Sequence, residues 1–76
     1  MPFAILDSVV VLADQPQHGL KCGDIGAVVH VYSPERVEVE FVRASGHTQA
    51  VVTLSVDQLR PVGPRDQLAV RQLDAA

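Results

Sequence analysis

The sequence predicts an all-β protein: a single small barrel of five short strands, followed by a C-terminal tail. One observation is length, because 76 residues make one domain with a thin core. A second is that stretches rich in valine recur at a spacing of about ten residues, separated by segments that hold glycine, proline or aspartate. A third is strict alternation of apolar and acidic residues in the middle of the chain, which is the period of a half-buried strand.

We expect strands over residues 9–13, 26–32, 37–43, 48–54 and 59–62. In the third, Val37, Val39 and Phe41 alternate with Glu38 and Glu40, so the two glutamates share one face. A single helical turn over residues 55–58 precedes the short last strand. This order of elements is typical of an SH3-like barrel.

The connections carry residues suited to turns. Gly19 and Gly23 lie in a long loop over residues 14–24, and Gly46 takes the left-handed position of a hairpin loop over residues 44–47. The pair Gly63–Pro64 breaks the last strand, which divides the chain into a barrel over residues 1–62 and a tail over 63–76. Apolar residues within 65–73 have nearly helical spacing, so the tail is predicted to be helical if it is ordered. A helix this short is not stable alone, and it docks, binds a partner or frays.

Charge and composition indicate the kind of partner. The whole net charge of −3 lies in residues 1–62, because the charged residues of the tail cancel. An acidic barrel repels phosphate backbones, so nucleic acid is disfavoured and a protein partner with a basic surface is favoured. The single cysteine allows no intrachain disulfide, no apolar run reaches the ~20 residues of a membrane span, and the first residues lack a basic leader. We therefore expect a cytoplasmic protein without a membrane segment.

The strongest local motif is Gly23-Asp24-Ile25-Gly26. We interpret it as a tight turn in which the Asp24 carboxylate accepts hydrogen bonds from nearby amides and both glycines relieve backbone strain. A phosphate-binding loop would need a following helix and a Lys-Ser/Thr ending, whereas this motif leads into a strand.

No constellation for catalysis or metal binding is apparent. His18 and Cys22 are four residues apart, and His30 and His47 lie elsewhere. Zinc needs three or four converging ligands, usually with paired short spacings. We therefore predict no catalytic residue, no metal and no cofactor, and a protein that is not an enzyme.

A contact surface for a partner is predicted instead. Glu38 and Glu40 form an acidic stripe, and Tyr32 is the only tyrosine in a chain without tryptophan. An aromatic groove for proline-rich peptides is therefore missing. The predicted contact residues, from loops and strands, are His18, Lys21, Tyr32, Glu38, Glu40 and Arg43. A homo-oligomer formed through Val42 or the tail helix is an alternative.

Three segments carry a family resemblance: residues 19–32, from Gly-Leu-Lys-Cys-Gly-Asp-Ile-Gly to Val-Tyr; residues 37–41, Val-Glu-Val-Glu-Phe; and residues 54–62, Leu-Ser-Val-Asp-Gln-Leu-Arg-Pro-Val. Together they resemble domain-of-unknown-function family 4926, small stand-alone bacterial proteins. More loosely, the pattern is similar to the SH3-like barrels of electron-transport accessory proteins and of the nitrile hydratase small-barrel domain.

The resemblance implies the fold and transfers no catalytic residue. It suggests a protein-binding module, most concretely an antitoxin- or immunity-like neutraliser of a neighbouring gene's product. An accessory or regulatory subunit of an enzyme or electron-transfer complex is the alternative. A nucleic-acid or ribosome binder, prompted by a KOW-like turn at residues 23–26, comes third because the charge distribution opposes it.

Overall fold

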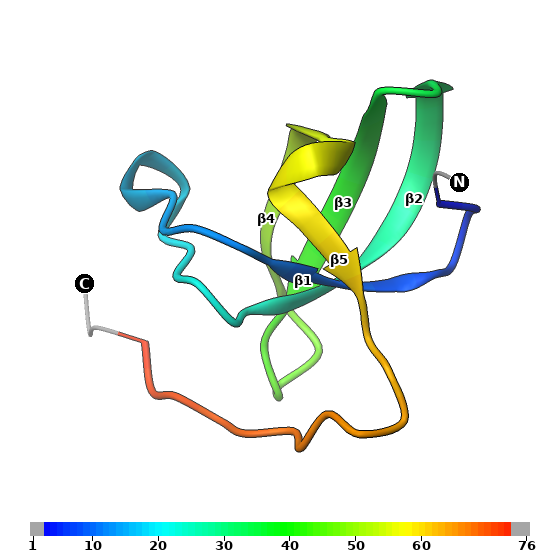
Figure 1. Ribbon diagram of the computed structural model, residues 1–76. Helices are drawn as coiled ribbons and strands as arrows, with labels where there is room; N and C mark the ends of the chain where they lie inside the picture. Colours follow the sequence, from blue (N-terminus) through cyan, green and yellow to red (C-terminus); the bar gives the residue numbers. More distant parts are fainter. Residues whose placement is uncertain (1–2, 74–76) are drawn as a thin grey trace.

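The computed structural model describes residues 3–73, which form one five-stranded antiparallel sheet with two short 3-10 turns (Figure 1). The elements are β1 (Ser8–Val11), η1 (Pro16–His18), β2 (Ile25–Ser33), β3 (Arg36–Val42), β4 (Thr48–Ser55), η2 (Val56–Gln58) and β5 (Leu59–Pro61). The all-β prediction is confirmed, and each expected strand lies within two residues of the observed one. The helical turn before the last strand is confirmed as η2.

The strand order is β4-β3-β2-β1-β5, so the first strand pairs with both the second and the last. Val9 lies opposite Gly26 on one side and opposite Pro61 on the other. The sheet is coiled, and in Figure 1 the short strand β5 crosses in front of the longer strands and ends beside β1. This order is compatible with an SH3-like barrel. β4 and β5 are the two edge strands in this order of the sheet.

The core is apolar and dominated by valine, because β-branched side chains pack well on a pleated sheet. Its buried members come from all five strands and the β1–β2 loop: Val9, Val11, Leu20, Val28, Val37, Val39, Phe41, Val52, Leu54 and Leu59. The alternation predicted for β3 holds, with Val37, Val39 and Phe41 in this core and the two glutamates on the opposite face.

The two glycines of the Gly23–Gly26 motif have different roles. Gly23 has a φ of 96°, a left-handed conformation that relieves strain as predicted. Gly26 has no such φ, so the prediction of backbone strain there is wrong. A Cβ at Gly26 would lie 2.5 Å from Val39 Cγ1 and 2.9 Å from the Glu40 carbonyl oxygen. Glycine therefore stands there because β2 and β3 pack closely.

A bulge in β2 determines what its outer half presents to solvent. Val28 pairs with Val39, but His30 pairs with Glu38, so Val29 is an extra residue on β2. Strict alternation would have placed His30 and Tyr32 inside with Val28. The extra residue instead turns His30 to the face that carries Glu38, and Tyr32 reaches the same face at a second register shift, between Val31 and Ser33.

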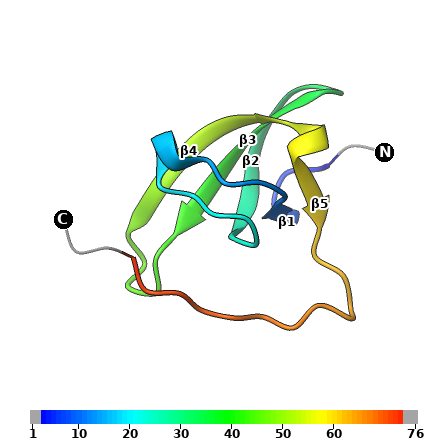
Figure 2. The ribbon, with the colours of Figure 1, turned by 60° about the vertical axis from the view of Figure 1, so that its left-hand side comes forward.

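The tail differs from the predicted helix. Residues 63–73 contain a turn and then an extended segment without helix, which passes below the sheet toward the β1–β2 loop (Figures 1 and 2). A short helix needs an apolar face to bury, and here Val70 is wholly exposed. Side-chain contacts to the barrel hold the extended form instead, chiefly those of Arg71. Residues 74–76 of the expected tail lie outside the described residues.

Candidate functional site

The structure places five of the six predicted contact residues in two separate groups. Tyr32, Glu38 and Glu40 lie together on the solvent face of β2 and β3. Lys21 and Arg43 lie apart from them, beside a groove between the β1–β2 loop and the β3–β4 hairpin. His18 is exposed at the end of η1 and lines neither that groove nor the hollow beside it. The predicted residues therefore do not form one surface: they belong to two separate surfaces, and His18 belongs to neither.

The first surface, which we call the acidic face, consists of His30, Tyr32, Glu38, Glu40 and Val51. His30 and Glu38 lie directly opposite each other on β2 and β3, and Glu40 lies opposite Val51 on β3 and β4. Side chains directly opposite in an antiparallel pair share a face. Tyr32 is 53% exposed and Val51 is 51% exposed, so an aromatic and an apolar contact flank the carboxylates.

Short polar contacts order this face. The Tyr32 hydroxyl donates to Glu38 Oε2 over 3.2 Å, and the Thr48 hydroxyl donates to Glu40 Oε2 over 2.6 Å. The His30 and Tyr32 rings meet edge to face with centroids 4.4 Å apart. The rings and carboxylates are thus held in place before any partner arrives.

The negative charge of the acidic face has no cationic partner in the described chain. Among residues 3–73 the ion pairs are Arg60 with Asp66 and Arg71 with Asp24, both away from this face. A partner cation brought near Glu38 and Glu40 would therefore meet charge that no side chain of this region already neutralises.

The loop that borders the groove is ordered by its own side chains. Asp14 Oδ1 accepts a hydrogen bond from the Cys22 amide over 2.8 Å. Asp24 Oδ2 accepts one from the Lys21 amide over 2.9 Å, which confirms the capping role predicted for Asp24. Gly19 closes η1 with a φ of 70°. The loop therefore presents a fixed wall to the groove.

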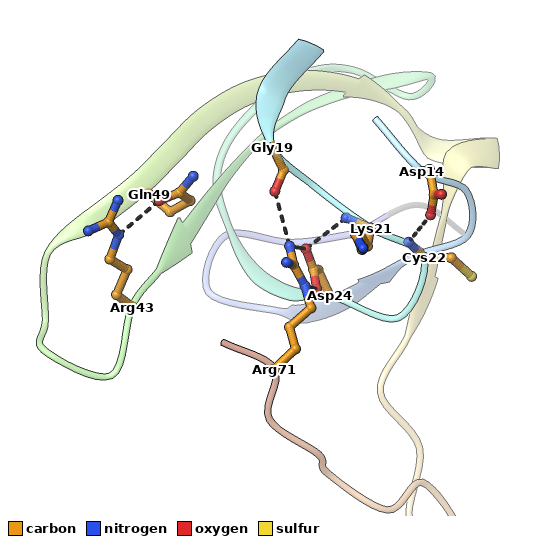
Figure 3. A network of polar contacts seen from close by, with 8 residues as sticks. All are labelled: Asp14, Gly19, Lys21, Cys22, Asp24, Arg43, Gln49 and Arg71. Carbon is orange, nitrogen blue, oxygen red and sulfur yellow. Dashed lines mark hydrogen bonds and ion pairs between the residues drawn. The ribbon is translucent and has the colours of Figure 1, made fainter. Parts of the chain in front are cut away.

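The opposite wall is the β3–β4 hairpin, where Arg43 Nε donates to Gln49 Oε1 over 2.8 Å (Figure 3). The groove has a volume of about 730 Å³ with the tail in place, and Ala69, Val70, Arg71 and Leu73 of the tail form part of its lining. A smaller hollow of about 380 Å³ adjoins it and brings Lys21 and Arg43 to one place.

Sequence reasoning missed the ion pair that joins the tail to this region. Arg71 of the tail reaches into the groove and forms an ion pair with Asp24, with Nη2 2.6 Å from Oδ2 (Figure 3). This arginine's hydrogen bond is the main cause that lowers the pKa of the Asp24 carboxyl. The two residues are 47 positions apart, and no spacing in the sequence connects them.

Groups that would hold a metal are not found in the region that the structure describes. No cluster of three or more histidine, cysteine, aspartate or glutamate side chains occurs within residues 3–73. Among the same residues, no helix has the length and the apolar composition that a bilayer span requires.

These features define a small all-β domain with one antiparallel sheet and two polar surfaces. The chain belongs to the family described as Domain of unknown function (DUF4926), whose sequence model matches residues 5–61. This match confirms the family predicted from the sequence, and it ends with β5, so the tail lies beyond it. No curated protein and no solved structure matches the chain.

Proposed function

We propose that this protein is a non-catalytic binding module that holds a partner protein with a basic surface through the acidic face. One observation carries the proposal: Glu38 and Glu40 project side by side from a rigid strand, beside an exposed tyrosine, without an ion pair to any residue of 3–73. Opposite charge on the partner would raise the association rate by steering the encounter.

The acidic face also offers apolar and aromatic contacts that would add to the affinity for a partner. Tyrosine is enriched at interface centres because its ring buries apolar area while its hydroxyl keeps a polar contact. Tyr32 is already held by Glu38 and His30, so binding costs it little further rotamer freedom. Val51 adds apolar area on the neighbouring strand.

The role that we propose for such a module is an antitoxin- or immunity-like neutraliser in the bacterial cytoplasm, which covers the basic active surface of a neighbouring gene's product. The lone cysteine and the acidic barrel support this setting. The family resemblance supports it as well.

A second candidate, an accessory subunit of an enzyme complex, is favoured by one observation. Ile25 and Val42 leave much apolar surface exposed beside the groove, and permanent interfaces are more apolar than transient ones. The genes beside this one distinguish the two roles, because a toxin-like gene supports the first and an enzyme operon supports the second.

The experiment is quantitative affinity capture from the native host, with mass spectrometry of the bound proteins. The test variant is Glu38→Gln with Glu40→Gln, which removes the charge and keeps the shape. The matched control is Glu35→Gln in the β2–β3 turn, whose carboxylate forms no ion pair within residues 3–73.

The proposal predicts a basic partner that the wild type and the control recover equally and that the double variant loses. Capture of the protein alone contradicts it, and so does a partner that the double variant retains in full.

A further inference from the structure

The tail is aimed at the groove by a turn just after β5. Asp66 Oδ2 accepts a hydrogen bond from the Gly63 amide over 2.6 Å, and both Asp66 oxygens pair with Arg60, over 2.8 and 2.9 Å. This turn sends the extended segment back below the sheet, where it reaches the β1–β2 loop and the β3–β4 hairpin (Figure 2).

One side chain joins that segment to the loop. Arg71 donates from Nε to Asp24 Oδ1 over 2.8 Å and from Nη2 to Asp24 Oδ2 over 2.6 Å, as a two-pronged pair. The same Nη2 donates to the Gly19 carbonyl over 3.0 Å (Figure 3). A planar guanidinium is the group that fits such a fork of two carboxylate oxygens and an adjacent carbonyl.

The receptor for this arginine is built without the tail. Backbone hydrogen bonds from Asp24 to Lys21 and from Val11 to Asp24, each 2.9 Å, fix the position of Asp24. Its carboxylate also accepts the Lys21 amide. The Gly19 carbonyl is directed by the left-handed end of η1. Both acceptors are thus in place for any guanidinium that enters the groove.

The tail, by contrast, is attached to the groove by few contacts. No backbone hydrogen bond joins residues 67–73 to the rest of the described chain. Val70 is 100% exposed and Leu68 is 67% exposed, while Leu73 is half-buried against both hollows. An extended segment fixed chiefly by Arg71 and Leu73 can be exchanged for another segment with the same two side chains.

We propose that the groove recognises an extended segment of a partner protein that carries an arginine followed two residues later by a leucine, and that residues 69–73 are an internal occupant which this segment displaces. The groove shares no residue with the acidic face, so this inference does not depend on the function proposed for that face. The partner's arginine takes the place of Arg71 on Asp24, and its leucine takes the place of Leu73.

Competition by the tail sets the size of the measurable effect. If the tail holds Asp24 and covers the groove about nine-tenths of the time, the apparent affinity for an outside segment is about tenfold lower than the intrinsic one. Arg71→Ala in the full chain opens the groove and removes that penalty. Arg65→Ala is the matched control, since Arg65 lies in the same tail and has no contact with the groove.

The probe is a fluorescein-labelled peptide with the sequence of residues 67–73, titrated by fluorescence anisotropy against the full-length variants. We expect it to bind Arg71→Ala about tenfold more tightly than it binds the wild type or Arg65→Ala. A peptide with alanine in place of its arginine should lose this binding. Asp24→Asn in the Arg71→Ala chain should also weaken binding, although asparagine can still accept the Lys21 amide.

Three results would overturn the proposal. One is the absence of peptide binding to the Arg71→Ala chain. Another is equal binding of the peptide that lacks arginine, a readout that does not depend on how any variant folds. The third is a wild-type dimer, seen by sedimentation, that Arg71→Ala dissociates, because the occupant in trans would then be a second copy of this chain.

Discussion

Replacing Gly26 with alanine tests the close packing of β2 on β3. The new Cβ would lie 2.5 Å from Val39 Cγ1, 2.8 Å from Phe41 Cε2 and 2.9 Å from the Glu40 carbonyl oxygen. That carbonyl belongs to a strand paired on both sides, so it cannot move without disturbing two ladders. Overpacking of this kind costs about 1–3 kcal/mol. For a domain of this size, each kcal/mol lowers the melting temperature by roughly 4–8 °C.

The measurement is urea denaturation of Gly26→Ala beside Gly63→Ala. A Cβ at Gly63 meets nothing closer than the Asp66 carboxylate at 3.6 Å, and the backbone φ there is ordinary. Alanine at such a site is neutral or stabilises by about 0.4–1 kcal/mol through the unfolded state. Equal unfolding free energies for the two variants would refute the close packing described for β2 and β3.

Three further predictions concern η2 and the tail. Ser55→Ala should lower the unfolding free energy by about 1 kcal/mol in urea denaturation, because Ser55 begins the capping box of η2; an unchanged midpoint would contradict this. The pKa of Asp66 is lowered from 3.8 to about 2, mainly by the hydrogen bond from Arg60. The ion pair therefore stabilises the folded protein fully above pH 3.8, and this stabilisation is lost as the pH falls toward 2. Carbon NMR titration of the carboxyl should show that midpoint, and a wild-type value near 3.8 would refute the pairing. Arg71→Ala should lower the backbone order parameters of residues 69–73 below about 0.6, whereas Arg65→Ala should leave them unchanged; equal values in both variants would exclude Arg71 as the anchor.

The strands could be predicted because local pattern and tertiary structure agree in them. In β3 the alternation of Val37, Val39 and Phe41 with two glutamates gives the buried face and the solvent face directly. The tail could not be predicted in this way. Its apolar spacing suits a helix, but spacing carries no information on whether a surface exists to bury the apolar side, and the extended form is held by Arg71 on a distant loop.

The candidate sites were only partly predictable for the same reason. Glu38 and Glu40 were placed together by the period of a strand. Tyr32 joins them because β2 has two register shifts, at Val29 and between Val31 and Ser33, and a bulge has no reliable signature in a single sequence. The sequence identifies Asp24 as a turn residue, yet its role as an arginine receptor depends on a contact across 47 positions.

The claim that a basic partner meets the acidic face is tested most directly by the association rate constant as a function of salt. With the partner captured from the host, stopped-flow measurements from about 50 to 500 mM salt should show that rate constant falling about tenfold or more, since screening weakens steering. In the Glu38→Gln, Glu40→Gln variant the association rate constant should decrease less with increasing salt. A rate constant that does not change with salt, or the same salt dependence in both proteins, would contradict the account.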